Sequence, residues 1–333
     1  ASSYQSGDLK IASFNTNVQQ VYNGGNTSKE IDSLLNVNKY DVALLIEWFD
    51  KKGSINRKHY PHQQFVNLNA LSNRYNYGIR LVSKHKIINW ERIKYAHKTT
   101  NMAAYFDIEI NGEIIRFVGT HLESNMISSN DYHTLVKLDV DEAYKTYALK
   151  FFKRLKSHIL LRSSQTKTVL EAIKNSPYPV VIMGDLNDTP QSFTYELLQK
   201  GRKDAFIEKG NGWGATYLKP FPLLRIDYIL YDEELTCTDY KRIQAAQSDQ
   251  AQHQREPLPS VAEGPRRHQG RGGRTHRQVL RHHGAHRRAG ERRIRPRPGT
   301  HQEIRGSRRG HDFPRGHHRT VDVQAIRRRG ESA

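Results

Sequence analysis

The sequence predicts an α/β layered sandwich in which strands outnumber helices. Short apolar runs such as DVALLIE (41–47) and PVVIMGD (179–185) are typical of strands that are buried on both faces. A helical pattern runs from about residue 135 to 175, between two of these runs. Polar residues follow the apolar runs, where strand ends and loops gather. These three observations indicate sheets that are covered by helices and have a polar rim.

Each element follows from a local pattern. LKIASFN (9–15) alternates and is rich in β-formers, and Ile31 to Val37 reads as a short amphipathic helix. Asn111-Gly112 is a strong hairpin signal between two of the later strands. After 9–15 and 41–47, the predicted strands are 77–84, 103–110, 114–122, 179–185 and 225–231.

The long helical region carries two sets of apolar residues. The first set lies near one face of the helix, and the second set follows toward its carboxyl end. The first comprises Leu149, Phe152, Leu155 and Ile159, and the second Val169, Leu170 and Ile173.

Composition excludes several classes of protein. The 333 residues allow one large domain or two ordinary ones, with enough sequence for a real core. Cys237 is the one cysteine, so an intrachain disulfide framework and a four-cysteine zinc site are excluded. No apolar run is long enough for a transmembrane helix, which needs about 18 residues.

Charge divides the chain in two. The net charge is +19, of which residues 1–242 carry +6 and residues 243–333 carry +13. The second part lacks Lys and Tyr, and Phe313 is its only aromatic residue. We therefore predict a domain over 8–249 and a tail over 250–333 that is disordered or foreign to the domain. A basic arm that binds nucleic acid, a solvated tail without a role, and an out-of-frame or fused segment all remain open for it.

Polar residues end several apolar strands and form a constellation. Carboxylates and carboxamides that converge on one face offer the hard oxygen ligands that Mg²⁺ or Mn²⁺ prefers. Such a metal can polarise a phosphoryl oxygen, and a nearby imidazole can position or protonate the phosphate. The residues are Asn15, Glu47, His121, Asp185 with Asn187, and Asp227.

These residues lie in motifs that resemble the endonuclease/exonuclease/phosphatase superfamily, whose fold is DNase I-like. GDLND followed about 40 residues later by RIDYI is a specific pair. The resemblance covers about residues 8–249. Within the superfamily, the sequence is most similar to bacterial members whose substrate is unassigned. It implies a four-layered α/β/β/α sandwich of two mixed sheets. The motifs are SFN (13–15), LLIE (44–47), GTHLES (119–124), GDLND (184–188), RIDYI (225–229) and Ser248-Asp249.

The resemblance implies a role for each residue. Glu47 would be the main ligand of Mg²⁺ or Mn²⁺, with Asn15 and Asp249 at the same metal site. Asp185 would activate the attacking water, and Asn187 would bond the phosphoryl oxygens.

Further roles concern the phosphate and the substrate. His121 would contact the scissile phosphate or assist the leaving group. Asp227 would orient a final histidine. Trp213 and Tyr217, in a glycine-rich loop, would bind substrate by stacking, although simple loop packing explains them equally well.

The sequence departs from the superfamily at that final histidine. The last motif reads Ser248-Asp249-Gln250, and Gln cannot take up a proton near neutral pH. The apolar strand that should follow is not recognisable, so we expect the last strand to be missing or replaced and activity to be impaired. His253, three positions further on, is a weak substitute because nothing fixes its geometry.

Three functions follow from these observations. The first is a metal-dependent hydrolase of phosphodiester or phosphomonoester bonds, a nuclease or phosphodiesterase acting by in-line attack of water. The second is a catalytically inactive member of the fold that binds phosphate ligands, nucleic acid or a protein partner. The third is a tail that binds nucleic acid without specificity. We expect a soluble monomer, either in the bacterial cytoplasm or exported after removal of a signal.

Overall fold

The computed structural model describes residues 8–19, 27–68, 76–125, 131, 134, 142–217, 224–244 and 320–328. These residues all belong to one compact unit, which comprises residues 1–246 and 313–333. No helix in the described ranges is long and apolar enough to cross a bilayer. The strands are β1 (Leu9–Asn15), β2 (Val42–Phe49), β3 (His62–Asn67), β4 (Tyr77–Ser83), β5 (Lys86–Ile93), β6 (Met102–Ile110), β7 (Glu113–His121), β8 (Val180–Asp185), β9 (Arg202–Asp204), β10 (Asp227–Asp232), β11 (Leu235–Gln244) and β12 (Thr320–Arg328). The helices are η1 (Asn17–Gln19), α1 (Ser28–Val37), η2 (Asp50–Lys52), α3 (Glu142–Ile173), α4 (Phe193–Gln199) and α5 (Ala205–Lys209).

The strands form two mixed sheets. The first has the order β11-β12-β1-β2-β4-β3, and the second has the order β5-β6-β7-β8-β10-β9. In each sheet one pair of neighbours is parallel, β1 with β2 and β7 with β8. Parallel neighbours end at the same edge of a sheet, so the polar ends of these four strands gather there.

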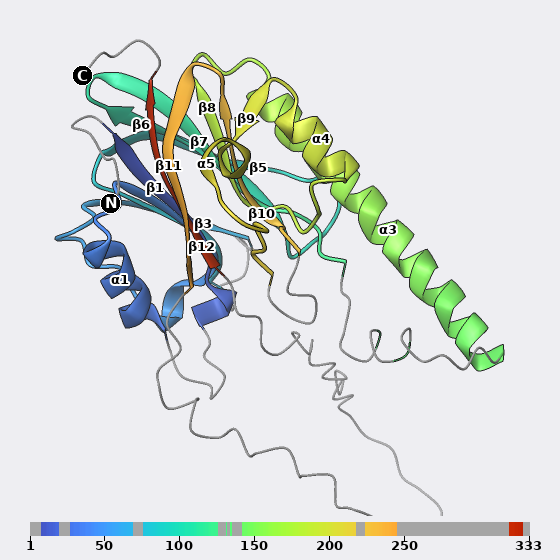
Figure 1. Cartoon of the computed structure of the whole chain (residues 1–333). Coiled ribbons are helices and arrows are strands. Elements are labelled where there is room, and N and C mark those ends of the chain that lie inside the picture. Colours follow the sequence, from blue (N-terminus) through green and yellow to red (C-terminus); the bar gives the residue numbers. More distant parts are fainter. Residues whose placement is uncertain are drawn as a thin grey trace, which may run out of the picture. The chain divides into compact units, whose positions relative to one another are not determined.

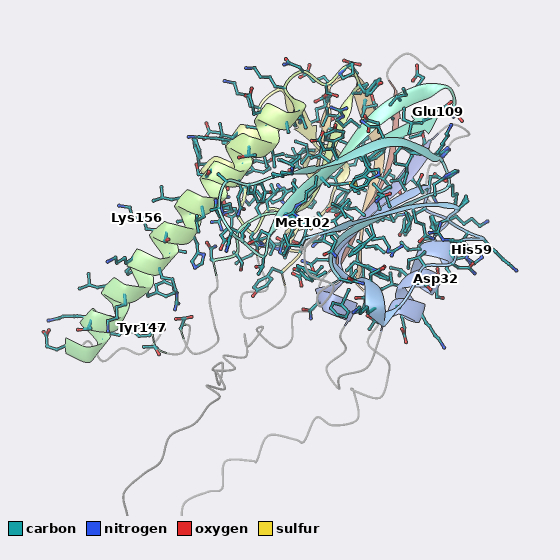
Figure 2. All side chains as sticks on the ribbon, turned by 180° about the vertical axis from the view of Figure 1, so that it is seen from behind. Asp32, His59, Met102, Glu109, Tyr147 and Lys156 are labelled. Atoms are coloured by element: carbon teal, nitrogen blue, oxygen red, sulfur yellow. The ribbon has the colours of Figure 1, made fainter. Side chains whose placement is uncertain are left out.

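Apolar side chains fill the space between the sheets and beneath the helices. Leu44 of the first sheet and Phe106 of the second are both fully buried in one central cluster. Helix α1 covers the outer face of the first sheet, where Leu35 packs in a second cluster. Helix α3 covers the outer face of the second sheet through Val169 and Ile173 (Figures 1 and 2). This four-layered α/β/β/α arrangement confirms the predicted fold class.

Most predicted elements are present. The strands expected at 9–15, 77–84 and 179–185 are β1, β4 and β8, and each boundary is within one residue. The turn at Asn111-Gly112 joins β6 to β7, and both residues have positive φ, 52° and 85°, as a tight hairpin requires.

Several elements escape the sequence patterns. HQQFVN and KIINWERI form β3 and β5, which lie at the edges of the sheets and carry few fully buried residues. Edge strands keep a solvated face, so they lack the continuous apolar run of a central strand.

Strand β12 corrects the expectation of an unstructured tail over Thr320–Arg328. These residues pair antiparallel with both β1 and β11, and Val323 lies opposite Ala12 and Lys241. A segment about 75 residues beyond β11 in sequence therefore replaces the expected last strand. Its short V-x-V alternation is lost in the basic composition around it. The remainder of the tail, 250–319 and 329–333, lies outside the described residues.

Candidate active site

Three polar residues lie side by side at one end of the second sheet. In the parallel β7–β8 pair, His121 is opposite Asp185. In the antiparallel β8–β10 pair, Asp227 is opposite the same Asp185. Residues in register on neighbouring strands project to the same face, so the three side chains form one row. All three are buried, with exposed fractions of 7% or less.

The first sheet contributes two residues to the same place. The amide Nδ2 of Asn15 donates to Glu47 Oε1 at 2.9 Å and to Asp185 Oδ2 at 3.2 Å. The second of these bonds joins the two sheets. His121 Nε2 lies 3.5 Å from Glu47 Oε1, which connects the sheets a second time. The predicted residues Asn15, Glu47, His121 and Asp185 are thus in direct contact.

The backbone at Glu47 has an unusual conformation. Its φ is 54°, which is rare for a residue with a side chain, and the β2–β4 register shifts between Leu45 and Trp48. Thr16 Oγ1 lies 2.9 Å from the carbonyl oxygens of both Ile46 and Glu47 and holds this bulge. Strain of this kind is typical of functional positions, because the surrounding structure must maintain it. Thr16 directly follows the SFN motif, yet its type alone does not indicate this role.

The GDLND segment forms a compact turn that presents Asn187. The backbone N–H of Asn187 donates to Asp185 Oδ1 at 2.8 Å, and its Nδ2 donates to the Leu122 carbonyl at 2.8 Å. Gly184 has a φ of 140°, and a Cβ at this position would lie 2.1 Å from the Thr120 carbonyl oxygen. Only glycine allows β8 to approach β7 this closely. Asp185 thus uses one carboxylate oxygen for the turn to Asn187 and the other for the contact with Asn15.

Arg162 of α3 ties the loops after β7 and β8 to the helix. Its Nε donates to Asp188 Oδ2 at 2.9 Å, its Nη1 to the Glu123 carbonyl at 2.6 Å and its Nη2 to Asn125 Oδ1 at 2.9 Å. Its side chain is only 1% exposed. An arginine in a predicted helix is usually a packing or surface residue, so the sequence does not reveal its connection to the site. Its spacing of seven from buried Val169 places it on the inner face of α3 and is the signal that was available.

An Arg162→Met variant is expected to lower the free energy of unfolding by about 3 kcal/mol, since it leaves a mostly buried carboxylate unpaired. Urea denaturation followed by circular dichroism measures this. Lys145→Met is the matched control on the same helix, because Lys145 pairs with Glu142 at 2.7 Å and both side chains are exposed. That pair should contribute at most about 1 kcal/mol. Equal losses for the two variants would contradict a special role of Arg162.

A second polar cluster holds the chain segment that leads into β10 at Asp227. Thr216 Oγ1 accepts from the backbone N–H of Ile226 at 3.0 Å and of Asp227 at 3.1 Å. Arg225, two residues before Asp227, pairs with Asp204 at 2.7 Å, and both side chains are buried. Tyr195 donates to the same carboxylate at 2.8 Å, and burial, followed by the charge of Asp204, raises the pKa of Tyr195 to about 12.

Two other predicted residues, Trp213 and Tyr217, lie in the loop before β10. Trp213 is 83% exposed, and Tyr217 is half-buried, in the loop that carries Thr216. Asp249, Gln250 and His253 lie outside the described residues, so their placement stays a prediction.

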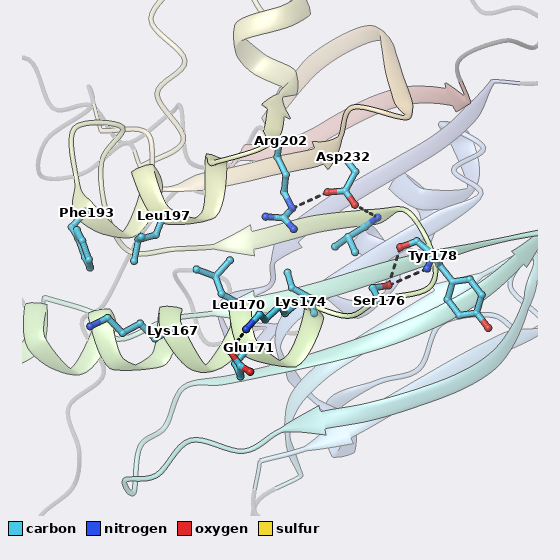
Figure 3. Close-up of a pocket in the computed structure, with 12 residues that line it drawn as sticks. Lys167, Leu170, Glu171, Lys174, Ser176, Tyr178, Phe193, Leu197, Arg202 and Asp232 are labelled. Atoms are coloured by element: carbon cyan, nitrogen blue, oxygen red, sulfur yellow. Dashed lines mark hydrogen bonds and ion pairs between the residues drawn. The ribbon is translucent and has the colours of Figure 1, made fainter.

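A separate pocket lies at the opposite end of β8. It has a volume of about 510 Å³ and is lined by residues of α3 and α4, together with an ion pair between Arg202 and Asp232 at 3.0 Å (Figure 3). Val180, at the start of β8, lines it, whereas Asp185 ends the strand. The pocket therefore does not belong to the candidate site.

The donor set suits a hard divalent cation, although no dedicated cage is present. In the described part of the chain, no three His, Cys, Asp or Glu side chains are grouped as a metal site. Mg²⁺ is usually held by one or two carboxylates, with waters and substrate phosphates completing the shell. Glu47, whose carboxylate accepts a hydrogen bond from the Asn15 amide, has the oxygen atoms that such a site would use.

Comparison with protein families places the chain in a known group. The family model described as "Endonuclease/Exonuclease/phosphatase family" matches residues 12–249. The chain belongs to the endonuclease/exonuclease/phosphatase family. The match contains every described residue of the contact network above, from Asn15 to Asp227. A search of the curated proteins finds no match.

Solved structures of endonuclease/exonuclease/phosphatase proteins share this fold. An endonuclease/exonuclease/phosphatase from Beutenbergia cavernae DSM 12333 aligns with a TM-score of 0.52 and 14% identity, covering 71% of this chain and 67% of its own. A family protein from Bacteroides thetaiotaomicron gives 0.52 and 13%, covering 72% and 89%. A functionally unknown conserved protein from Enterococcus faecalis V583 gives 0.53 and 14%, covering 72% and 93%. At these identities the likeness establishes the fold alone.

Proposed function

We propose that this chain is a divalent-metal-dependent hydrolase of phosphodiester or phosphomonoester bonds, acting by in-line attack of water on phosphorus. The observation that carries the proposal is the double hydrogen bond of Asn15, to Glu47 and to Asp185. Through it the polar residues of three strands, β1, β2 and β8, meet at a single point. Buried polar groups that converge in this way are unusual unless they bind or react with a ligand.

Asp185 is the group that takes the proton of the attacking water. Its two oxygens are held by Asn15 Nδ2 and the Asn187 backbone N–H, so the carboxylate cannot rotate. A fixed carboxylate can orient water for attack opposite the leaving oxygen and accept its proton as the new P–O bond forms.

Two further side chains act on the phosphoryl group. The Asn187 amide is oriented by its bond to the Leu122 carbonyl, and its second N–H can donate to a phosphoryl oxygen as charge builds there. His121 contacts the scissile phosphate or donates a proton to the leaving oxygen as that P–O bond breaks. Asp227 lies opposite Asp185 on the neighbouring strand, where it would orient the final histidine of the site.

Glu47 and Asn15, together with Asp249, are the residues that would hold Mg²⁺ or Mn²⁺. The bound cation would neutralise negative charge on the phosphoryl oxygens. The remote loop with Trp213, which is 83% exposed, would stack on a base or sugar if the substrate is a nucleic acid. A phospholipid head group and a soluble phosphate ester are equal alternatives to nucleic acid as the substrate.

Removal of divalent metal tests the proposal. Hydrolysis of a generic phosphodiester such as bis(p-nitrophenyl) phosphate should fall to background in excess chelator and return when Mg²⁺ or Mn²⁺ is added. Glu47→Gln should raise the Mg²⁺ concentration needed for half-maximal rate at least about tenfold, because a neutral amide is a weaker ligand. Glu113→Gln, at the far end of β7, is the control. Turnover that is unaffected by chelator would refute the metal dependence.

A second candidate function is favoured by one residue. Gln250 stands where the final histidine would be, which favours an impaired enzyme or an inactive member that binds phosphate or nucleic acid. A Gln250→His variant should gain about 10²–10⁴ in rate if the missing imidazole limits turnover. Phosphate-ester binding without turnover in both the original and the Gln250→His chain would instead support the inactive member.

A further inference from the structure

The outer face of α3 combines exposed apolar residues with lysines. Leu149 is 73% exposed, Phe152 is 59% exposed and Leu160 is 60% exposed. With Lys153 and Lys156 they follow helical spacings of three and four, so all five share one side of the helix. We call these five residues the α3 outer face. They include Leu149 and Phe152, which the sequence places near one face, and both are exposed in the described part of the chain.

The position of this face in the molecule explains its exposure. The carboxyl half of α3 packs on the second sheet through Val169 and Ile173. The amino half extends beyond the sheets, with Tyr147 and Lys156 on this part (Figures 1 and 2). Ordinary surface helices bury such residues, and a cluster of exposed large apolar side chains marks a binding surface.

The charge of α3 is positive over most of its length. Between Glu142 and Glu171 the sequence contains no acidic residue. Lys150, Lys153 and Lys156 are exposed, and in the described part of the chain no ion pair involves them. The α3 outer face therefore offers apolar contact and positive charge on the same surface.

Charge and chemistry together select the partner. A helix face on which Phe and Leu stand among Lys can lie in the interface of an anionic bilayer. The apolar side chains would insert, while the long lysine side chains reach up to the phosphate head groups. A nucleic acid would attract the lysines but would leave Leu149 and Leu160 exposed. A second copy would bring the central lysines of two helices together, at a cost in repulsion.

We propose that the α3 outer face docks on an anionic lipid surface, with Leu149, Phe152 and Leu160 inserted and Lys153 and Lys156 on the head groups. This docking is independent of the hydrolase proposal, since no residue of the α3 outer face touches the candidate site. It brings the whole domain to a membrane surface without a spanning segment.

Co-sedimentation of the full chain with vesicles tests the proposal. The chain should bind vesicles of phosphatidylcholine with phosphatidylglycerol at least about tenfold more tightly than vesicles of phosphatidylcholine alone. A Phe152→Ser, Leu160→Ser double variant should lose at least about tenfold in affinity for the anionic vesicles, because two apolar side chains no longer insert. Val37→Ser is the matched control, since Val37 is 73% exposed on α1. It should bind like the original chain.

The positive charge of the arginine-rich tail would also attract anionic lipid. The serine variants separate the two effects because they leave every charge in place. Unchanged vesicle binding by the double variant overturns the proposal and assigns binding to the tail or to charge alone. A double variant that weakens binding to duplex DNA, or that converts a dimer to a monomer in size-exclusion chromatography, with vesicle affinity unaltered, also overturns it. Unaltered circular dichroism of the double variant confirms that its fold is kept.

Discussion

We expect an Asp185→Asn variant to lose the proposed hydrolytic activity by a factor on the order of 10³ or more, while the domain stays folded. The carboxylate is fully buried and holds both Asn15 and Asn187 in place. An amide of the same shape cannot accept a proton from water, and one of its two ends donates where the carboxylate accepts. The loss therefore combines a missing base with a misaligned Asn15.

The effect is measured as kcat on a phosphodiester in saturating Mg²⁺, alongside urea denaturation. Asp232→Asn is the matched control, because Asp232 ends β10 at the opposite edge of the same sheet. It should change the rate only a few-fold. An Asp185→Asn variant that kept the original rate would remove Asp185 from the reaction and would sink the proposed mechanism.

A Val323→Pro variant lowers the free energy of unfolding by about 3 kcal/mol or more. Val323 lies in β12 with a neighbouring strand on each side, opposite Ala12 of β1 and Lys241 of β11. Proline has no N–H to donate to the ladder, and its ring clashes in the middle of a sheet. Loss of β12 would also turn β1, which carries Asn15, into an edge strand, so activity should fall together with stability.

Thermal unfolding of the full chain and the phosphodiester rate together test this prediction. Val279→Pro is the control, because it makes the same change elsewhere in the basic tail, outside the described residues. It should leave both readouts near the original values. A Val323→Pro chain with unchanged melting would show that Thr320–Arg328 do not complete the first sheet in solution.

The strand patterns were predictable because they depend on local burial. PVVIMGD becomes β8 within one residue, since a strand buried on both faces needs consecutive apolar side chains. The edge strand HQQFVN (β3) has no such pattern, and its position is decided by its partner β4. Strand β12 was missed for a similar reason, because its pairing partners lie far away in sequence and its neighbours in the chain are basic.

The candidate site was predictable in its members but not in its contacts. Asn15, Glu47, His121 and Asp185 were singled out because polar residues end apolar strands and match a family's motifs. Their meeting depends on the packing of two sheets, because Asn15 and Asp185 are 170 residues apart in sequence. Arg162 was not recognised, since a helical arginine has many possible partners and only the packed loops provide Asp188.

By itself, the sequence determined which segments become central strands, which polar residues stand at their ends, and where the basic tail begins. Those features arise from the alternation and burial tendency of neighbouring residues. The tertiary structure alone decided that β12 completes the first sheet and that Glu47 adopts a positive φ beside Thr16. It also decided that the apolar residues of the α3 outer face are exposed. These outcomes depend on surfaces that come together from distant parts of the chain, and no local pattern contains that information.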